Sequence, residues 1–258
     1  MASEAYRNMR ANTPGHLSVL SIFATVDGEC NGFGQGSMSV FIRLTGCRVG
    51  CNYCDTKYSW ALGQGRQMTP DEIVDEVISV GQGISKVTLT GGEPLEQDGE
   101  EMLVLLRALI AKGYAISIET SGMLSFAQYI HSDRISLVVD LKSPATVPGH
   151  QVPLLEEMVR LTDRRHYIKV VITDFPSFIW ALTTVADLRS RGCDATVYFS
   201  PDHNRMPAHE LFNLMMTDAQ CRQMNIGLNM QLHKYLFPEN FREEELYLPV
   251  TDKGNPNA

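Results

Sequence analysis

Three cysteines lie close together in the stretch TGCRVGCNYCDTKYSW, residues 45–60, where Cys47, Cys51 and Cys54 are spaced Cys-x3-Cys-x2-Cys. A structural zinc site is closed by four ligands, usually supplied as two pairs, and the sequence has no second Cys-x2-Cys or Cys/His pair. An iron–sulfur cluster prefers thiolates, and three of them on a four-iron cluster leave one iron open to a substrate or cofactor. The spacing therefore favours a catalytic four-iron cluster over zinc.

Composition narrows the class of protein. The chain has 258 residues, 44% of them hydrophobic, and a formal net charge of −8. We expect no nucleic-acid partner, because an acidic chain is poorly suited to a phosphate backbone. We expect no membrane contact, because no apolar run approaches the roughly 18 residues of a membrane span.

The N-terminus lacks the apolar segment of a signal peptide, so we expect a cytoplasmic protein with reduced thiols. In that compartment a tight cysteine cluster binds metal or takes part in catalysis. The isolated Cys30, Cys193 and Cys221 are expected to be small apolar core residues.

The elements that must position the cysteines alternate along the chain. Strands are expected at residues 39–44, 86–90, 114–120, 135–142, 166–173, 195–201 and 225–230. Helices are expected at 69–80, 99–111, 152–161, 177–190 and 207–224. Near-continuous apolar strands separated by helices are typical of a parallel sheet covered on its outside.

Six or seven βα units are fewer than the eight of a full barrel. We therefore expect an α/β fold, a partial open barrel of the (β/α)6 type. It forms one domain over residues 1–258, with an N-terminal extension at 1–17 and a C-terminal one at 237–258. Ligands of such sheets bind at the C-terminal ends of the strands. The segments at these ends carry the chemically interesting residues: the cysteine loop, GGEP, ETSG, DLKSP and QLH.

Together with TGGEP (90–94), the cysteine spacing resembles the radical S-adenosylmethionine (SAM) enzymes. The resemblance implies that SAM chelates the open iron and that reduction of the cluster cleaves it to methionine and a 5′-deoxyadenosyl radical. Tyr53 matches the aromatic residue that this family carries before its last cysteine. The resemblance also implies a set of SAM neighbours: Gly91, Gly92, Glu93, Thr120, Ser121, Lys142 and Ser143.

Further segments are similar to the 7-carboxy-7-deazaguanine synthases, in the same order along the chain from about residue 20 to 236. They are SIFATVDGEC, FIRLTGC, CDT, GGEP, ETSG, DLKSP and QLHKYL. This family of carbon–nitrogen lyases converts 6-carboxy-5,6,7,8-tetrahydropterin to 7-carboxy-7-deazaguanine, losing ammonia, in queuosine-type 7-deazapurine biosynthesis. The resemblance implies a homodimer with one 4Fe-4S cluster per subunit, Mg²⁺, SAM regenerated at each turnover, and an electron donor such as flavodoxin.

The same resemblance assigns Thr56 of CDT to Mg²⁺, which prefers oxygen ligands and often binds few protein groups. From the sequence alone, Asp55 and Thr56 are better interpreted as caps of the loop, and the match of the whole CDT segment reverses this preference. Substrate-binding candidates are Asp27, Glu29, Arg43, Gly92 and His233. A carboxylate such as Glu29 suits paired N–H donors of a pterin, and an arginine fork suits its carboxylate. The family usually has Gln-Gly-Glu-Gly where this chain has Asp-Gly-Glu-Cys, which puts in doubt the contact that the family's glutamine makes and that Asp27 would take over.

Two alternatives stay open at this point. One is a different radical SAM reaction, such as activation of a glycyl-radical enzyme, which a pterin assay would separate. The other is a non-catalytic zinc-binding scaffold, which would be colourless where an iron–sulfur protein is brown.

Overall fold

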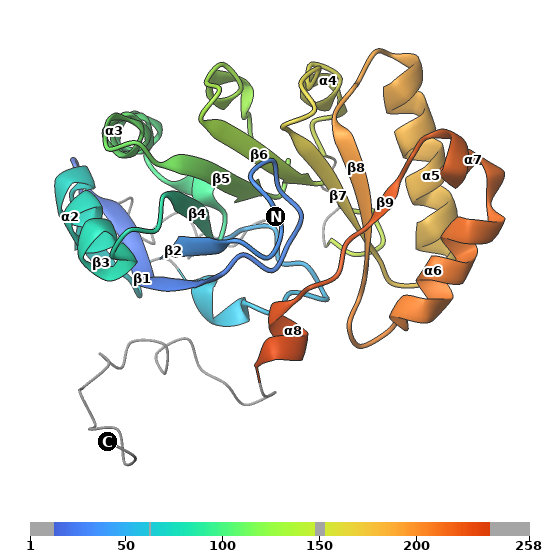
Figure 1. Ribbon diagram of the computed structural model, residues 1–258, viewed down its shortest axis with the longest axis horizontal. Coiled ribbons are helices and arrows are strands. Elements are labelled where there is room, and N and C mark those ends of the chain that lie inside the picture. Colours follow the sequence, from blue (N-terminus) through green and yellow to red (C-terminus); the bar gives the residue numbers. More distant parts are fainter. Residues whose placement is uncertain (1–12, 62, 148–152, 238–258) are drawn as a thin grey trace, which may run out of the picture.

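The computed structural model describes residues 13–61, 63–147 and 153–237. Most of the two expected extensions, residues 1–12 and 238–258, lies outside the described residues. The described chain forms one sheet in the order β3-β1-β2-β4-β5-β6-β7-β8-β9 (Figure 1). The strands are β1 (Leu17–Val26), β2 (Met38–Leu44), β3 (Arg66–Met68), β4 (Lys86–Gly91), β5 (Ala115–Thr120), β6 (Ile135–Asp140), β7 (Tyr167–Ile172), β8 (Thr196–Pro201) and β9 (Gly227–Leu228).

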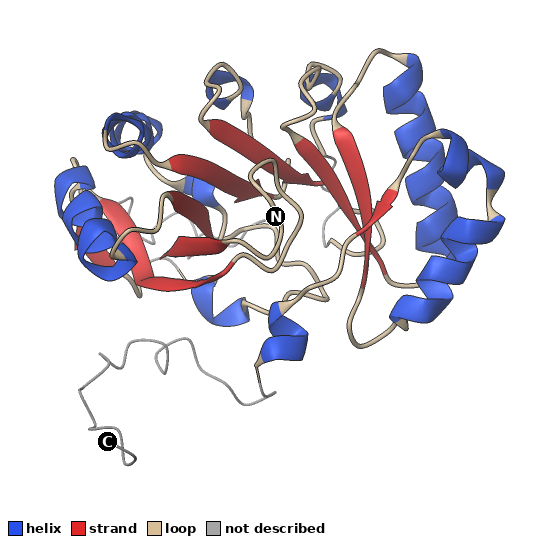
Figure 2. Ribbon diagram, in the orientation of Figure 1, coloured by secondary structure: helices blue, strands red, loops and turns tan. Residues whose placement is uncertain are grey.

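All neighbours from β2 through β9 pair in parallel, which confirms the predicted partial α/β barrel. Helices line the outer side of the curved sheet (Figure 2). They are α2 (Pro70–Gly81), α3 (Gly99–Ala111), α4 (Leu155–Met158), α5 (Phe175–Ser190), α6 (Ala208–Thr217) and α7 (Ala219–Gln223). The short α8 (His233–Leu236) lies apart from them, below the sheet in Figure 1. Within the described ranges, three short 3-10 helices lie in the connections: η1 (Lys57–Ser59), η2 (Pro94–Glu96) and η3 (Ala127–Tyr129).

The helices form where capping and apolar spacing agree. Thr69 accepts a hydrogen bond from the backbone N–H of Glu72, whose side chain bonds back, so a capping box opens α2. Ile73 and Val77 then face the sheet and are fully buried. Within the described residues, no helix combines the length and the apolar character needed to cross a membrane.

The first strand of the sheet runs against the others. β1 pairs antiparallel with β2, so that Val19 lies opposite Leu44 and Val26 opposite Met38. The sequence reading missed this strand and also the short β3. As a result, the loop that follows β1 starts at the N-terminal ends of the parallel strands, opposite to the cysteine loop.

Two helical predictions were also too simple. The pattern at 207–224 is divided at Asp218, which ends α6 and whose carboxylate accepts from the Cys221 N–H to start α7. The pattern at 152–161 contains only the short α4, and residue 152 itself lies outside the described residues.

The glycine-rich loop, residues 27–36, runs across the sheet from β4 to the end of β9. Its Asp27 pairs with Lys86 of β4 at 2.9 Å. The Gly32 N–H donates to Ser136 Oγ of β6 at 2.9 Å, and the Cys30 N–H donates to Asn229 Oδ1, just after β9, at 2.9 Å. A Cβ on Gly32 would lie 2.5 Å from a backbone oxygen, so only glycine permits this approach. The loop therefore forms a floor inside the partial barrel.

Candidate functional site

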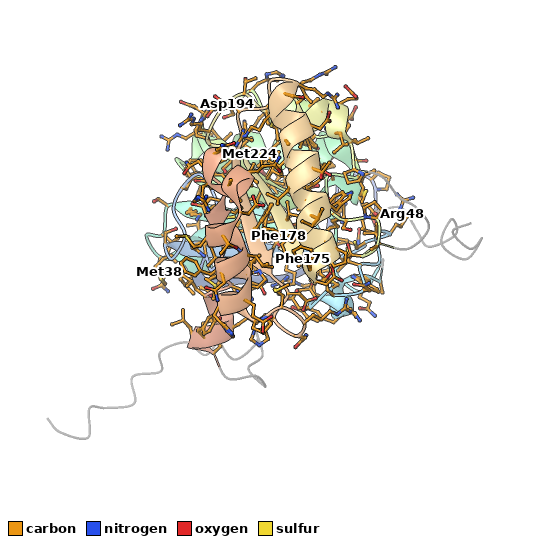
Figure 3. All side chains as sticks on the ribbon, turned by 90° about the vertical axis from the view of Figure 1, so that its right-hand side faces the viewer. Met38, Arg48, Phe175, Phe178, Asp194 and Met224 are labelled. Carbon is orange, nitrogen blue, oxygen red and sulfur yellow. The ribbon has the colours of Figure 1, made fainter. Side chains whose placement is uncertain are left out.

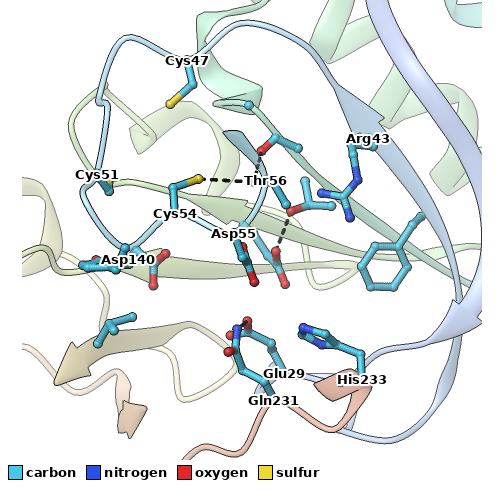
Figure 4. A pocket seen from close by; sticks show the side chains of 18 of the residues that line it. Glu29, Arg43, Cys47, Cys51, Cys54, Asp55, Thr56, Asp140, Gln231 and His233 are labelled. Carbon is cyan, nitrogen blue, oxygen red and sulfur yellow. Dashed lines mark hydrogen bonds between the residues drawn. The ribbon is translucent and has the colours of Figure 1, made fainter. Parts of the chain in front are cut away.

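A cavity of about 1110 Å³ opens between this floor and the C-terminal strand ends (Figure 4). Figure 4 shows the three cysteines on one side of it and Glu29, Gln231 and His233 across from them. Most of the predicted site residues line this cavity: Asp27, Glu29, Arg43, Cys47, Cys51, Tyr53, Cys54, Thr56, Gly91, Gly92, Glu93, Thr120, Ser121, Lys142 and His233. Ser143 does not, since its side chain is buried and accepts from the Ala145 N–H.

The cysteine loop, residues 45–60, has its own small apolar cluster. Cys51 packs with Val49 and Val147, and Cys47 and Cys54 lie half-buried against them. Burial raises the pKa of the Cys47 thiol to about 12 and also raises the pKa of Cys51. The charge of a bound metal reverses this preference, because coordinating thiols are deprotonated.

The donor set fits a four-iron cluster. In the described part of the chain, no three His, Cys, Asp or Glu side chains converge on one ion position. A zinc ion needs such convergence, whereas each thiolate of a cubane binds a different iron. The Trp60 indole N–H donates to Cys54 Sγ at 3.3 Å, the kind of hydrogen bond that tunes cluster potentials.

The GGEP segment is joined directly to the cysteine loop. The Gly92 N–H donates to Leu44 O at 2.9 Å, and the Glu93 N–H donates to Gly46 O at 2.7 Å. A Cβ would lie 2.4 Å from backbone atoms of Leu44 at Gly91, and 2.2 Å from Gly46 O at Gly92. Both positions therefore require glycine, and the segment's backbone is held beside the cysteines.

Glu93 ties this segment to the next strand end. Its carboxylate accepts from Thr120 Oγ1 at 2.7 Å, from the Ser121 N–H at 2.7 Å and from the Leu95 N–H at 3.1 Å. Burial raises the pKa of Glu93 although these donors lower it. The role of Glu93 as a SAM neighbour stays a prediction, and its carboxylate already binds donors from Leu95, Thr120 and Ser121.

Thr56 is the N-terminal cap residue of the 3-10 helix that follows it, but its side chain does not take part in the capping. Its hydroxyl instead lies 3.5 Å from Cys54 Sγ and donates to Gly91 O, also at 3.5 Å. Both contacts are long, and Thr56 lines the cavity between the cysteine loop and the GGEP segment. This position favours the metal-ligand interpretation over the loop cap.

Glu29 reaches the cavity from the floor. Its carboxylate contacts Lys169 Nζ, accepts from Gln231 Nε2 at 2.8 Å and accepts from Asn229 Nδ2 at 3.3 Å. These donors fix the direction of the carboxylate toward the cavity. Arg43, expected as a substrate ligand, is 7% exposed, and its guanidinium lies 5.8 Å from the ring centroids of Phe23 and Tyr58.

Asp27 is buried and contacts other protein side chains. Its carboxylate is 1% exposed, pairs with Lys86 and accepts from Thr88 Oγ1 at 2.7 Å. Lys86 Nζ also donates to Asn31 Oδ1 at 2.8 Å and to Ser37 Oγ at 3.0 Å. The pair therefore orders the glycine-rich loop, and substrate contact by Asp27 stays untested.

The C-terminal part of the described chain covers the cavity. Lys234 pairs with Asp55 of the cysteine loop at 3.0 Å, and the Leu232 N–H donates to Gly28 O at 3.0 Å. His233 lies next to Gly28, and burial lowers the pKa of its imidazole. The segment thus bridges the floor and the cysteine loop.

The sequence analysis did not single out Lys169, Gln231, Glu119 or Asp140 as site residues, although all four line the cavity. A lysine in the otherwise apolar strand YIKVVI was the available signal. Lys142 and Lys169 hold the pKa of Asp140 below its usual value despite its burial. Glu119 accepts from Thr90 Oγ1 at 2.6 Å, and burial, with Glu29 nearby, raises the pKa of Glu119 to about 7.

Comparison with known proteins gives three kinds of match. The profile of the radical SAM superfamily matches residues 41–172. The 7-carboxy-7-deazaguanine synthase of Koribacter versatilis is 30% identical over 86% of this chain and 97% of its own. That of Methanospirillum hungatei is 32% identical over 85% of each chain.

Solved structures share the fold. The crystal structure of QueE from Escherichia coli superposes with a TM-score of 0.63 at 22% identity, over 90% of this chain and 99% of that one. Streptococcus suis SuiB bound to S-adenosylmethionine gives a TM-score of 0.53 at 12% identity, over 72% of this chain and 45% of that one.

Proposed function

Because this chain belongs to the radical SAM superfamily and, within it, to the 7-carboxy-7-deazaguanine synthases, we propose a specific reaction for its cavity. It is a lyase, and its substrate is 6-carboxy-5,6,7,8-tetrahydropterin, which it rearranges to 7-carboxy-7-deazaguanine with loss of ammonia. The observation that carries the proposal is one cavity that holds the three cysteines, Glu29 and Arg43 together.

Each side of the cavity has its own task. Cys47, Cys51 and Cys54 would hold the 4Fe-4S cluster, which with SAM supplies the 5′-deoxyadenosyl radical chemistry. Glu29 would accept the paired N–H donors of the aminopyrimidinone edge, and Arg43 would bind the carboxylate by its fork. The floor and the segment at 231–236 would exclude water from the radical.

Lys142, Thr120 and Ser121 belong to the SAM side. Lys142 Nζ lies 3.0 Å from Asp140 Oδ2 and 5.5 Å from the centroid of the Tyr53 ring. Thr120 and Ser121 are fixed through Glu93. These contacts support a binding surface for the methionine and ribose groups beside the open iron.

Mg²⁺ would bind at Thr56, which lines the cavity and whose side chain makes no capping hydrogen bond. Thr56→Ala removes one oxygen ligand, so we expect lower activity and a raised magnesium requirement with unchanged cluster absorbance. Thr56→Ser keeps the hydroxyl and should keep much of the activity. A wild-type magnesium titration of Thr56→Ala would make the hydroxyl structural.

The proposed reaction is tested with anaerobically reconstituted protein, SAM, a reductant and the pterin. We expect about four irons per chain, formation of the deazaguanine, and many turnovers per SAM consumed. Replacing any cavity cysteine with alanine should abolish iron binding and SAM cleavage together. Replacing Cys30, Cys193 or Cys221 should leave the iron content intact. Absence of product from the pterin would favour a different radical SAM reaction.

The assembly proposals are a single domain over the whole chain, a cytoplasmic homodimer, and an external electron donor such as flavodoxin. Four exposed apolar side chains on α5 and α6 support a protein contact there: Phe175, Ile179, Phe212 and Met216. Figure 3 shows this side of the molecule, with Phe175 labelled. Sedimentation of wild type and of a Phe212→Ser, Met216→Ser variant measures whether a second copy covers this face. An unchanged dimer in the variant would place the interface elsewhere.

A further inference from the structure

Lys169 is a buried cation in the middle of β7. Its side chain is 7% exposed, and the strand around it is otherwise mostly apolar. Its Nζ contacts the Glu29 carboxylate and lies 3.3 Å from Asp140 Oδ1. Because a lysine is almost never fully buried without a partner, these two carboxylates account for its position.

The two partners come from opposite sides of the cavity. Glu29 lies on the floor loop, where Gln231 also donates to it. Asp140 ends β6 and pairs with Lys142, which lies over Tyr53 beside the cysteines. Glu29, Lys169, Asp140 and Lys142 therefore form a continuous carboxylate–lysine chain, and Figure 4 shows Asp140 near Cys51 and Cys54 and Glu29 beside Gln231.

We propose that Lys169 is a positioning residue that holds Glu29 for the pterin and Asp140 with Lys142 for SAM, and so couples the binding of the two ligands. This inference rests on the proposed function. Without Lys169, the Glu29, Glu119 and Asp140 carboxylates would share one buried region in which Lys142 pairs with Asp140. Mutual repulsion would turn both Glu29 and Asp140 away from their present directions.

The chain of alternating carboxylates and lysines would couple the binding of the two ligands, because each ligand would contact one end of it. SAM bound beside Lys142 would fix the Asp140 end, and Lys169 would pass this order to Glu29. The pterin would then bind a carboxylate that is already oriented, so SAM affinity and pterin affinity would each rise when the other is present. By linkage, the two factors must be equal.

The test uses reconstituted holoenzyme without reductant, so that SAM and the pterin bind but do not react. The SAM dissociation constant is measured with and without pterin, and the pterin constant with and without SAM. In wild type we expect each ligand to tighten the other. In Lys169→Met we expect both affinities to fall about tenfold, as for loss of a hydrogen bond to a charged group, and the mutual effect to disappear.

Two further variants keep the test decisive even if Lys169→Met fails to load its cluster. Glu29→Gln should weaken mainly the pterin, and Asp140→Asn mainly SAM. Each breaks one link of the chain, so each should also lose the mutual effect of the ligands. Mutual effects of wild-type size in either variant, or in Lys169→Met, would overturn the inference.

Val170→Ala is the matched control, since Val170 follows Lys169 on β7 but lies in the core and not in the cavity lining. It should lower the melting temperature and leave both affinities unchanged. The proposed function is judged separately by product formation in wild type with reductant. If wild type makes the product while Lys169→Met binds both ligands normally, only the role of Lys169 is wrong.

Discussion

Replacing Gly92 with alanine should break the joint between the GGEP segment and the cysteine loop. The new Cβ would lie 2.2 Å from Gly46 O and 2.7 Å from Gly46 C, both backbone atoms that cannot rotate away. To reach ordinary contact, the two segments must separate by roughly 1 Å or more. The Gly92 N–H to Leu44 O and Glu93 N–H to Gly46 O hydrogen bonds would stretch with them.

The magnitude follows from these contacts. Two weakened backbone hydrogen bonds cost about 1 kcal/mol each, and overpacking adds about 1–3 kcal/mol. The free energy of unfolding should therefore fall by about 3–5 kcal/mol. Native domains have about 5–15 kcal/mol in total, so the variant should fold. For a chain of this size, the melting temperature should fall by roughly 10 °C.

The rate of SAM cleavage should fall even in molecules of the variant that are folded. A misplacement of about 1 Å in a positioned site can cost about 100-fold in rate, so we expect SAM cleavage by the folded variant to fall about that much. Differential scanning calorimetry measures the first effect, and 5′-deoxyadenosine formation at saturating reductant measures the second.

Gly99→Ala is the control for the glycine change itself. Gly99 begins α3, and its Cβ would lie 3.7 Å from Gln128 Nε2, an ordinary contact. Its melting temperature should stay unchanged or rise slightly, because alanine suits a helix better than glycine. Wild-type melting and SAM cleavage in Gly92→Ala would refute the reasoning from close approach.

Three other outcomes are expected. The Trp60 N–H donor to Cys54 stabilises the reduced cluster, which is the more negative form, so Trp60→Phe should lower the reduction potential measured in a redox titration. An unchanged potential would mean that this hydrogen bond does not affect the cluster. Because Glu119 has a pKa raised to about 7 in the fold, its contribution makes stability fall as pH rises from about 4.5 to 7; thermal unfolding of Glu119→Gln should lose that part of the slope. Lys234→Ala breaks an ion pair with Asp55, so the pterin KM should rise several-fold, less so at high salt, with a melting temperature close to wild type. If the variant and the wild type have equal KM values for the pterin, the Lys234–Asp55 ion pair does not hold the segment at 231–236 over the cavity.

The parts of the site that local spacing determines were predicted from the sequence. Cys47, Cys51 and Cys54 lie on one loop, and the GGEP segment follows the neighbouring parallel strand, so both reach the same edge. The helix predicted at 99–111 agrees with α3 at both ends because Asp98 caps its start and Gly113 follows its end.

The floor of the cavity could not be predicted in this way. It depends on the direction of β1, and a run such as LSVLSIFATV carries no mark of antiparallel pairing. The role of Asp27 depends on Lys86, and that of Glu29 on Lys169, which are far away in sequence. Burial of these lysines is a property of the assembled sheet, since the residue type alone indicates an exposed side chain.

The floor loop has a consequence for the order in which the site is made during synthesis. Cys30 and Glu29 are held by Asn229 and Gln231, about 200 residues later in the chain. A nascent chain that has released β1 through β8 can already pair its parallel strands, but its glycine-rich loop still lacks these partners. Closing so long a loop is among the slowest steps of folding, since its entropy cost precedes its contacts. The cysteines are thus displayed on the ribosome before the floor of their cavity has all its partners, and the binding site is complete only when Asn229 and Gln231 have been released.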